Sequence, residues 1–414
     1  MTEHNEDRLL TLDEARARLL ALLPRLSQTE CVATEQAAGR TLAEPVVAPV
    51  DVPPAAVSLL DGYAVAAGDL PDPFPAEGVS LPVGQVIFAG QVGRPLEPGE
   101  AARIFTGAPL PEGADAVVAQ EAVTAADAHS VTLHRRLAVG ESLRPRAADV
   151  QRGQAVFSPG LRLHPGHVAQ LASLGLASVA VTRRPRVAVF TTGDELVVPG
   201  GTLAPGQIFN ANHAFLLSAL AGQSAEVIDL GQLPDDPDQL ADQLARASEQ
   251  ADLVLTSGGV SVGEADHLRT VVAQLGSLDS WRVFLKPGKP LAFGSVNGTP
   301  FIGLPGNPVS TFVTFYLFVL PALRHMAGAL DCLPRALPLP ADFTLDDPGD
   351  RPEFMRVRMV TRPDGRVVLE RFANQNSGIV SSLSWADALA RVPEHTVVRP
   401  GDLLECLCFA ELFS

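Results

Sequence analysis

The chain has 414 residues, of which 46% are hydrophobic and 19% charged, so it can bury several cores and is not disordered throughout. Asp and Glu number 47 against 31 Lys and Arg, a formal charge of −16. Such an acidic chain is a poor candidate for non-specific binding to nucleic acid or to an anionic membrane. The longest apolar run, residues 312–323, is shorter than a membrane span.

The four cysteines have no zinc-ligand spacing and are too few for a disulfide scaffold in a chain of this length. The N-terminus is charged and lacks the apolar core of a signal peptide. Both observations favour a reducing cytoplasm.

The first 182 residues combine helical and β-rich patterns. Residues 11–26 predict an amphipathic helix that begins with a capping box of Thr11 and Glu14. Residues 46–146 are rich in Val, Pro and Gly and indicate a small β-rich domain. A short strand is expected at 155–157 and a helix at 166–174.

Strands and helices alternate from residue 185 onward, which predicts a doubly wound, mostly parallel sheet. Asn297-Gly298 between the last two strands indicates a hairpin turn. The expected strands are 186–191, 225–230, 252–256, 281–285, 290–296 and 299–304, and the expected helices are 214–221, 237–250, 265–275 and 309–326.

The C-terminal part predicts a small β-barrel or sandwich. Residues 332–340 are rich in Pro and Leu and are typical of a linker. Short strands are expected after it, at 354–360, 366–371, 397–398 and 403–409.

Lysine occurs only twice in the chain, at Lys286 and Lys289, whereas arginine occurs 29 times. One interpretation is that the composition is biased toward arginine and that these two lysines remain by chance. The other is that their loop requires compact ammonium groups, which a planar guanidinium does not replace. The spacing of three residues within KPGKP favours the second interpretation.

Ligands of open α/β sheets bind beyond the carboxyl ends of the strands. The unusual loops fall there in series: TTGDEL (191–196), PDD (234–236), TSGGVSVGEAD (256–266), KPGKP (286–290) and LPGNP (304–308). The Gly-rich turns are either ordinary tight turns or places where backbone amides meet an oxyanion at a helix start. Two such turns with both lysines between them favour a cradle for phosphate or another oxyanion.

Three of these loops each contribute one candidate carboxylate, namely Glu195, Asp235 and Asp266. Each is either a helix cap or solvated loop charge, or a member of a set that converges on a hard cation such as Mg²⁺. Asp235 is the weakest of the three, because either Asp235 or Asp236 can cap the helix that follows.

The motifs DGYAV (61–65), TGAPLPEGADAVV (106–118), TGDEL, SGGVSVGEAD, KPGKP and LPGNP, in this order, resemble the molybdopterin molybdenumtransferase family, which includes the gephyrin E domain. The resemblance runs from Ser58 to about Ser382. It implies a Mg²⁺-dependent, cytoplasmic enzyme that inserts molybdenum from molybdate into adenylyl-molybdopterin and releases AMP, the last step of molybdenum cofactor biosynthesis. A homodimer with sites shared between subunits is also implied, as are contacts with molybdopterin adenylyltransferase and with molybdoenzymes.

The resemblance divides the chain into four domains. Residues 1–45 and 147–178 would form an elongated linking domain, with the N-terminal helix free to pack on the α/β domain. The remaining expectations are a β-rich lid domain at 46–146, a doubly wound α/β substrate-binding domain at 179–329 and a C-terminal β-barrel-like domain at 330–414.

The resemblance also implies roles for individual residues. The catalytic set is Asp266, Lys286, Lys289 and Glu195. The metal ligands are Glu195, Asp235 and Asp266. The substrate-binding set is Ser257, Gly258, Gly259, Asp235, Gly306, Asn307, Ser310, Arg356 and Ser377, together with Asp61 and Thr106 from the partner subunit. Arg282 stands where the family often has Lys, which leaves its role open.

Two other functions compete with this one. A nucleotidyltransferase that adenylylates the pterin from ATP would keep the α/β fold, but such enzymes resemble that domain alone. A non-enzymatic scaffold would need a peptide-binding surface and not the set of three carboxylates.

Overall fold

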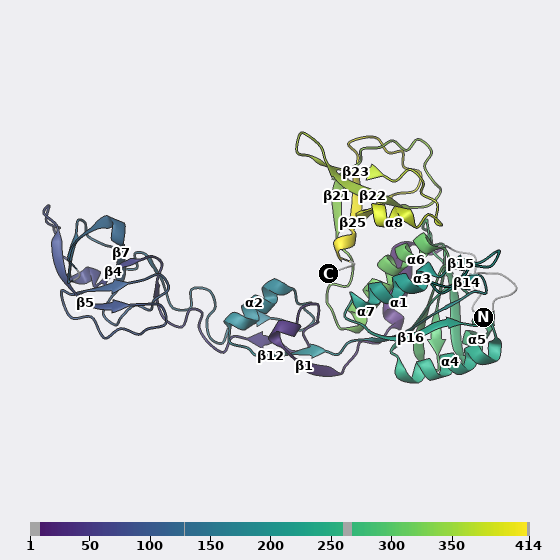
Figure 1. Ribbon diagram of the computed structural model, residues 1–414, viewed down its shortest axis with the longest axis horizontal. Helices are drawn as coiled ribbons and strands as arrows, with labels where there is room; N and C mark the ends of the chain where they lie inside the picture. The colour runs from purple at the N-terminus through teal and green to yellow at the C-terminus, as the bar shows by residue number, and fades with distance from the viewer. Residues whose placement is uncertain (1–8, 128, 260–266, 412–414) are drawn as a thin grey trace.

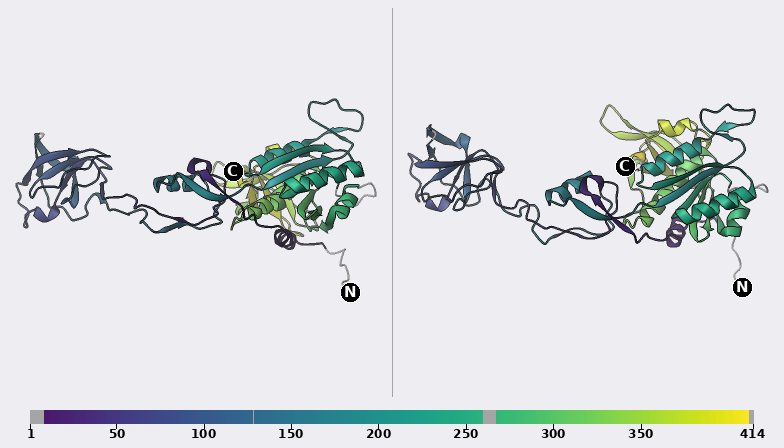
Figure 2. Two further views of the ribbon diagram at one scale, coloured as in Figure 1. Left: turned by 90° about the horizontal axis from the view of Figure 1, so that it is seen from below. Right: turned by 60° about the horizontal axis from the view of Figure 1, so that its bottom comes forward.

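The computed structural model describes residues 9–127, 129–259 and 267–411. The molecule is elongated and consists of four bodies (Figure 1). A β-rich body lies at one end, a slender linking body follows, and an α/β body and a C-terminal body lie together at the other end. The two views of Figure 2 show the same arrangement.

The β-rich body is built on one sheet with the strand order β7-β4-β6-β5-β9-β8. Its interior is aliphatic, with Val65, Val118 and Val131 in one cluster and Ile87 and Ile104 in another. The strands are β4 (Gly62–Val65), β5 (Val79–Ile87), β6 (Ala101–Ile104), β7 (Ala116–Ala119), β8 (Val123–Asp127) and β9 (Ser130–Leu133), with 3₁₀ turns at Ala67–Asp69 and Gln120–Ala122.

The linking body consists of short antiparallel pairs and one helix around Leu42, Leu171 and Val181. The chain passes through it twice, on the way to the β-rich body and back. The pairs are β1 (Thr29–Ala33) with β12 (Ser178–Thr182), β2 (Val46–Val47) with β11 (Ala155–Phe157) and β3 (Val57–Ser58) with β10 (Leu143–Arg144), and the helix is α2 (Pro165–Ser173), with a 3₁₀ turn at Thr34–Gln36.

The α/β body contains a six-stranded sheet in the order β16-β13-β17-β20-β19-β18. Neighbouring strands from β16 to β20 are parallel, and β19 and β18 complete the sheet in antiparallel pairs, so the predicted mostly parallel sheet is confirmed. The strands are β13 (Arg186–Thr192), β16 (Glu226–Leu233), β17 (Leu253–Ser257), β18 (Gly276–Arg282), β19 (Pro290–Val296) and β20 (Thr299–Leu304), and a small parallel pair, β14 (Leu196–Val197) and β15 (Ile208–Phe209), stands apart.

Helices cover both faces of this sheet, and each face has its own hydrophobic core. This arrangement confirms the doubly wound fold. One core gathers α1 (Leu12–Leu22), α3 (Ala211–Ala221), α6 (Pro308–Thr314) and α7 (Leu320–Met326), and the other gathers α4 (Pro237–Gln250) and α5 (His267–Leu275). The hairpin at Asn297-Gly298 is confirmed, since both residues have positive φ (49° and 84°) between β19 and β20.

Helix α1 begins as predicted and ends earlier. Thr11 Oγ1 accepts a hydrogen bond from the Glu14 N–H at 3.2 Å, and Glu14 Oε2 accepts one from the Thr11 N–H at 3.0 Å, so the capping box is confirmed. The helix stops at Leu22 instead of residue 26, because the residue before Pro24 is forced into extended backbone.

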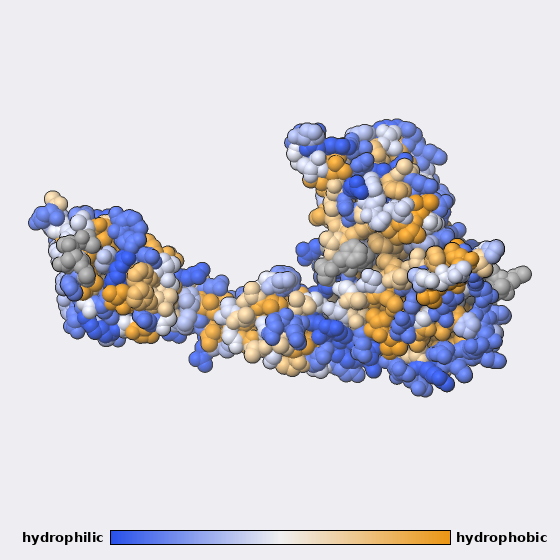
Figure 3. Space-filling model, in the orientation of Figure 1, coloured by the Kyte–Doolittle hydropathy of each residue, from blue (hydrophilic) through white to orange (hydrophobic). Residues whose placement is uncertain are grey.

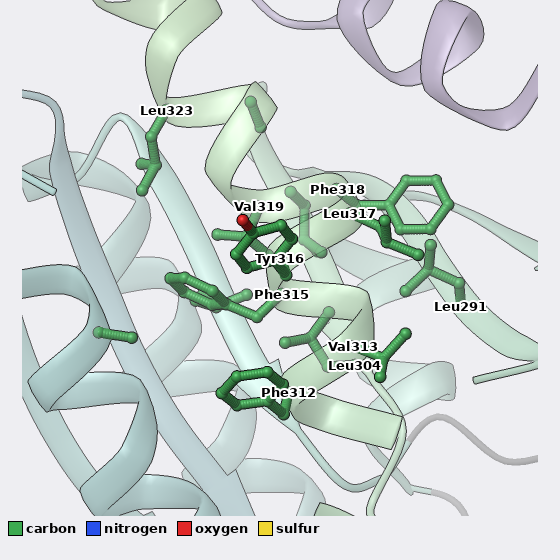
Figure 4. Packing of buried hydrophobic residues seen from close by; sticks show 14 of the residues in the cluster. Leu291, Leu304, Phe312, Val313, Phe315, Tyr316, Leu317, Phe318, Val319 and Leu323 are labelled. Atoms are coloured by element: carbon green, nitrogen blue, oxygen red, sulfur yellow. The ribbon is translucent and has the colours of Figure 1, made fainter. Parts of the chain in front are cut away.

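The predicted helix at 309–326 is continuous but passes through a π-helical turn, Phe315–Val319, between α6 and α7. Figure 4 shows its aromatic and aliphatic side chains packed against Leu291 and Leu304. By length and composition the stretch Pro308–Met326 passes as a membrane span, yet 94% of it is buried in the fold. It is therefore the core helix of the α/β body.

The C-terminal body is a five-stranded antiparallel sheet in the order β21-β25-β24-β22-β23. The predicted linker at 332–340 is partly wrong, because Ala336–Pro340 forms the edge strand β21, paired with β25. Proline is tolerated at an edge, where a backbone N–H need not donate a hydrogen bond to a neighbouring strand. The predicted strand at 397–398 is also wrong, since Val398 makes only an isolated bridge with Leu345. The elements are β21 (Ala336–Pro340), β22 (Glu353–Thr361), β23 (Val367–Arg371), α8 (Ser381–Trp385), β24 (Ala388–Val392) and β25 (Leu403–Cys408), with a 3₁₀ turn at Phe409–Glu411.

Candidate functional site

The strand register brings the predicted loops to one edge of the α/β sheet. Thr192 is paired with Leu233 and Ser257 with Leu304, so β13, β16, β17 and β20 all end at the same edge. β19 runs antiparallel to β20, and its first residue, Pro290, therefore lies at this edge as well. The lysine loop and the loops of Glu195 and Asp235 thus share one edge, which we call the carboxyl edge.

The turn after β17 is packed so closely that side chains are excluded, and the turn after β20 lies beside it. Gly258 and Gly259 have positive φ, 92° and 65°. A Cβ on Gly258 would lie 2.8 Å from the Thr192 carbonyl oxygen, and one on Gly259 would lie 2.6 Å from Thr192 Oγ1. A Cβ on Gly306, in the neighbouring turn, would lie 3.8 Å from Gly258 Cα. The chain needs glycine at 258 and 259 for close packing as well as for turn conformation.

Asn212 in the first turn of α3 joins these two turns. Its Nδ2 donates to Ser257 Oγ at 2.8 Å and to the Gly306 carbonyl at 2.7 Å. Sequence reasoning missed this residue, because it places the start of the helix at residue 214. A polar side chain next to the Asn210 that caps α3 was the available signal.

Ser257 is 2% exposed, and its hydroxyl is engaged within the fold. Besides accepting from Asn212, Oγ donates to the Pro305 carbonyl at 2.9 Å and lies 3.1 Å from Thr311 Oγ1. This serine therefore fixes the relation of the two turns, and the backbone of Gly258 and Gly259 is the part that a ligand can approach.

The two described carboxylates stand at neighbouring strand ends. Glu195 is exposed, and its loop is tied to β16 because Gln232 Nε2 donates to the carbonyls of Gly193 (3.0 Å) and Leu196 (3.1 Å). Asp236 caps α4 by accepting a hydrogen bond from the Gln239 N–H. Asp235, which is half-buried, is therefore not the helix cap. Asp266 lies outside the described residues. Within residues 9–127, 129–259 and 267–411, no three His, Cys, Asp or Glu side chains cluster as a metal site.

The two lysines differ in their surroundings. Lys286 Nζ donates to Glu353 Oε2 at 3.1 Å, and its backbone pairs with β22 of the C-terminal body. Lys289 is exposed, and within the described part of the chain its ammonium has no ion-pair partner. A Cβ on Gly288 between them would lie 2.6 Å from Thr314 Cγ2, so the loop rests on α6.

Ser377 connects the C-terminal body to the start of α6. The Ser377 carbonyl accepts from the Val309 N–H at 3.0 Å, next to Ser310, which is 4% exposed. Asn307 precedes α6 without capping it through its side chain.

Arg356 is fully buried, and burial lowers its pKa to about 10 although Glu353 opposes the shift. Nε donates to Ser382 Oγ at 3.1 Å and Nη2 to the Asn376 carbonyl at 3.2 Å. Nη1 is buried and has no hydrogen-bond partner among the described residues, which is costly for a charged group.

Asp61 and Thr106 lie in the β-rich body, at the other end of the molecule from the carboxyl edge (Figure 1). Asp61 Oδ1 accepts from the Thr106 N–H and Oγ1, each at 2.8 Å, and these bonds lower the pKa of Asp61. Figure 3 shows an open hollow between the β-rich body and the bodies at the other end. Within one chain, this pair is not brought to the carboxyl edge.

The fold and the carboxyl edge together define a multidomain α/β protein whose candidate site lies at the carboxyl ends of a doubly wound sheet. Residues 10–175 match the "MoeA N-terminal region (domain I and II)", residues 188–325 the "Probable molybdopterin binding domain" and residues 337–409 the "MoeA C-terminal region (domain IV)".

Curated relatives bear the name molybdopterin molybdenumtransferase. The one from Haemophilus influenzae is 42% identical over 77% of this chain and 78% of its own length, and one from Mycobacterium tuberculosis, named molybdopterin molybdenumtransferase 2, is 35% identical over 92% and 95%. The crystal structure of a molybdopterin biosynthesis moeA protein from Pyrococcus horikoshii OT3 is 30% identical, covers 97% of this chain and 100% of its own, and has a TM-score of 0.81. The chain belongs to the molybdopterin molybdenumtransferase family.

Proposed function

We propose that this chain transfers molybdenum from molybdate to adenylyl-molybdopterin, with release of AMP, at the carboxyl edge of the α/β sheet. The observation that carries the proposal is that one edge holds a lysine loop, two Gly-rich turns and the carboxylates Glu195 and Asp235. Molybdate and the phosphate groups of the pterin substrate are anions, and ammonium groups and backbone N–H groups are their natural partners.

Lys289 is the cation best suited to hold molybdate. Its exposed ammonium has no counter-ion in the described residues, whereas Lys286 is already paired with Glu353. We assign Lys286 the task of positioning the loop against the C-terminal body. The unsatisfied Nη1 of Arg356 provides a further donor for an oxyanion.

The Gly-rich turns are suited to the phosphates of the substrate. Bare backbone at Gly258, Gly259 and Gly306 lets a phosphate approach, and Asn307 and Ser310 stand where α6 begins. The soft sulfur ligands of molybdenum belong to the pterin dithiolene, so none of the four free cysteines is needed as a ligand.

Mg²⁺ fits the donor set of this edge. Glu195 and Asp235 supply hard oxygen atoms, and Mg²⁺ is commonly held by one or two carboxylates together with substrate phosphates and water. Asp266 is the third ligand in this proposal. When bound, the ion would stabilise the charge that develops as the phosphoanhydride bond breaks and AMP leaves.

A homodimer would complete the site. We propose that Asp61 and Thr106 act on the carboxyl edge of the partner subunit, with the hollow of Figure 3 receiving that subunit. We place the enzyme in the cytoplasm, with molybdopterin adenylyltransferase as supplier of the substrate and molybdoenzymes as acceptors of the product.

The decisive experiment measures molybdate-dependent AMP release from adenylyl-molybdopterin. Lys289→Ala is expected to lose roughly 100-fold in rate, the scale of removing one electrostatic donor from a reacting site. Arg246→Ala, on the exposed face of α4, is the matched control and keeps full activity. Full activity in Lys289→Ala would refute the assignment, and consumption of ATP with unmodified molybdopterin would point to the adenylyltransferase reaction instead.

A further inference from the structure

Two histidines lie at the N-terminus of α2, the helix of the linking body (Figure 1). His164 precedes the helix and His167 lies in its first turn, and the centroids of their rings are 3.5 Å apart. His164 is exposed, whereas His167 is half-buried and makes a T-shaped contact with the Phe157 ring. This pair lies outside the α/β body and takes no part in the site at the carboxyl edge.

Each of the two rings accepts a hydrogen bond from the backbone through Nδ1. His164 Nδ1 accepts from the Gly166 N–H at 3.0 Å, and His167 Nδ1 accepts from the His164 N–H at 3.1 Å. The first N–H groups of a helix have no partner within the helix, and a Ser, Thr, Asp or Asn oxygen usually accepts from them. Two imidazole nitrogens perform this task here, reciprocally, as in a capping box. A Cβ on Gly166 would lie 2.8 Å from His164 Cε1, so the ring lies directly against this turn.

The cap requires both imidazoles to be neutral. A ring nitrogen that accepts a hydrogen bond carries no proton, so the proton of each ring lies on Nε2. Protonation of either ring turns Nδ1 into a donor that faces a backbone N–H, and the hydrogen bond is lost. It also places a positive charge at the helix end where the peptide dipoles are already positive.

The groups around α2 do not hold a proton on these rings. Burial lowers the pKa of His167, and the neighbouring His164 lowers it further, whereas a carboxylate would raise it. α2 packs against the 3₁₀ turn Thr34–Gln36 and against β1, β2, β11 and β12. The titratable side chains of these elements are Glu30, Cys31 and Glu35, of which Glu30 is paired with Arg40, and the connecting segments of the linking body add Glu44, Asp149, Arg152 and Arg162.

We propose that His164 and His167 form a proton-sensitive joint, in which uptake of a proton by either ring opens the first turn of α2. The opening reaches both passes of the chain through the linking body. Just before the helix, the Leu163 N–H donates to the Arg40 carbonyl at 2.8 Å, and the Leu42 N–H donates to the Leu161 carbonyl at 2.9 Å. Because these passes carry the β-rich body, mild acid loosens the attachment of that body. This role is independent of the reaction proposed for the carboxyl edge.

The direction of the pH effect follows from the lowered pKa of His167. Histidine in an unfolded chain has a pKa of about 6.5, and the folded ring takes up its proton only at lower pH. The stabilisation from the cap is therefore complete above about pH 6.5 and is lost as the pH falls through the folded-state value.

The test measures hydrogen exchange of backbone amides in the full chain between about pH 7.5 and 5.5, a window that spans the ordinary histidine pKa. Rates are corrected for the intrinsic pH dependence of exchange. The opening constants of Gly166 and Val168, whose N–H groups bond to His164, should rise as the pH falls, by up to about tenfold per pH unit for each proton taken up. The amide of Leu163 should follow them.

A matched double variant removes the protons and keeps the cap. His164→Ser combined with His167→Gln gives the capping box of Ser and Gln, which has no titratable group, so its opening constants should not change with pH. His134→Gln is the control, because it removes a histidine of the β-rich body that bonds to Thr124 and should keep the pH profile of the parent. The proposal is overturned if the double variant also keeps that profile, or if the amides of α4 open in parallel with α2, which would be global acid unfolding.

A second measurement needs no substitution and decides the matter even if the double variant does not fold. The ¹⁵N chemical shifts of the imidazole nitrogens distinguish a proton on Nδ1 from one on Nε2. At about pH 7.5, above the ordinary pKa of histidine, both rings should carry the proton on Nε2 alone. A proton on Nδ1 of either ring at this pH would exclude the cap and overturn the proposal.

Discussion

The side-chain amide of Asn212 donates to the hydroxyl of Ser257 at 2.8 Å, and the same nitrogen donates to the Gly306 carbonyl at 2.7 Å. One residue of α3 thus ties together the turns after β17 and β20. Because the Ser257 hydroxyl also bonds to the Pro305 carbonyl, these four groups form one network that joins both turns. A network of this kind fixes backbone amides before a ligand arrives.

Replacing Asn212 should loosen this network. In Asn212→Ala the Gly306 carbonyl and the Ser257 hydroxyl lose their donor, which costs about 0.5–1.5 kcal/mol of unfolding free energy, the net scale of an ordinary hydrogen bond. We expect AMP release to fall at least tenfold, because both turns move. Urea unfolding and the AMP assay measure the two effects. Gln274→Ala, an exposed amide on α5, should change neither, and an Asn212→Ala enzyme with normal activity would contradict a positioning role.

Gly259 provides a second probe of the same turns. A methyl group there would lie 2.6 Å from Thr192 Oγ1 and 2.9 Å from Leu268 Cδ2, at a φ of +65°. Gly259→Ala should therefore cost about 1–3 kcal/mol through backbone strain and crowding and reduce AMP release strongly. Gly68→Ala is the control, because a methyl group on Gly68 would have no atom within 4 Å and its φ is ordinary. Equal behaviour of the two variants would refute the crowding argument.

The position of the candidate site could be predicted because it depends on local features. Buried strands, Gly- and Pro-rich turns after them and the rule of the carboxyl edge together place the loops of Glu195, Asp235 and Lys289 at one edge of the sheet. The hairpin at Asn297-Gly298 is equally local, because its turn residues tolerate positive φ.

Contacts between distant segments could not be predicted. The bond from Asn212 to Gly306 spans 94 residues, and Lys286 is neutralised by Glu353, 67 residues away. The edge strand β21 escapes prediction because its prolines suggest a linker, and only the pairing with β25 defines it. In each case a long-range packing contact, which composition does not encode, decides the structure.

Arg356 offers a test that separates binding from folding. Arg356→Met removes three donated hydrogen bonds, which destabilises the fold. It also removes a buried charge whose Nη1 is unsatisfied, which stabilises the fold and offsets part of that loss. We therefore expect the unfolding free energy to change by no more than about 1–3 kcal/mol. The molybdate concentration for half-maximal AMP release should rise at least tenfold.

Arg358 is the matched control on the same strand, since its guanidinium lies 4.5 Å from the centre of the Trp385 ring and its Nε donates to the Trp385 carbonyl. Arg358→Met should lose at most about 1 kcal/mol and keep the molybdate dependence of its parent. If Arg356→Met also kept that dependence, Arg356 would serve the fold alone.

The last prediction concerns pH. Asp252 accepts hydrogen bonds from Arg183 Nη1 and Nη2 and, at 2.8 Å, from the Arg186 N–H. Burial raises the pKa of Asp252, but these bonds outweigh it, so the pKa lies below its usual value. A lowered pKa means that the stabilisation is complete above the unfolded-state pKa of about 3.9 and is lost as the pH falls through the folded-state value.

Asp252→Asn should therefore be less stable than its parent at pH 7, by about 1.5–3 kcal/mol, the scale of hydrogen bonds to a charged group. The difference should shrink as the pH falls below about 4, where the parent carboxylate is itself protonated. Unfolding by urea across this range measures it. Asp364→Asn, at an exposed carboxylate beside Arg366, should show little difference at any pH. A loss in Asp252→Asn that is as large at pH 3 as at pH 7 would mean that side-chain shape, and not charge, holds the linking body to the sheet.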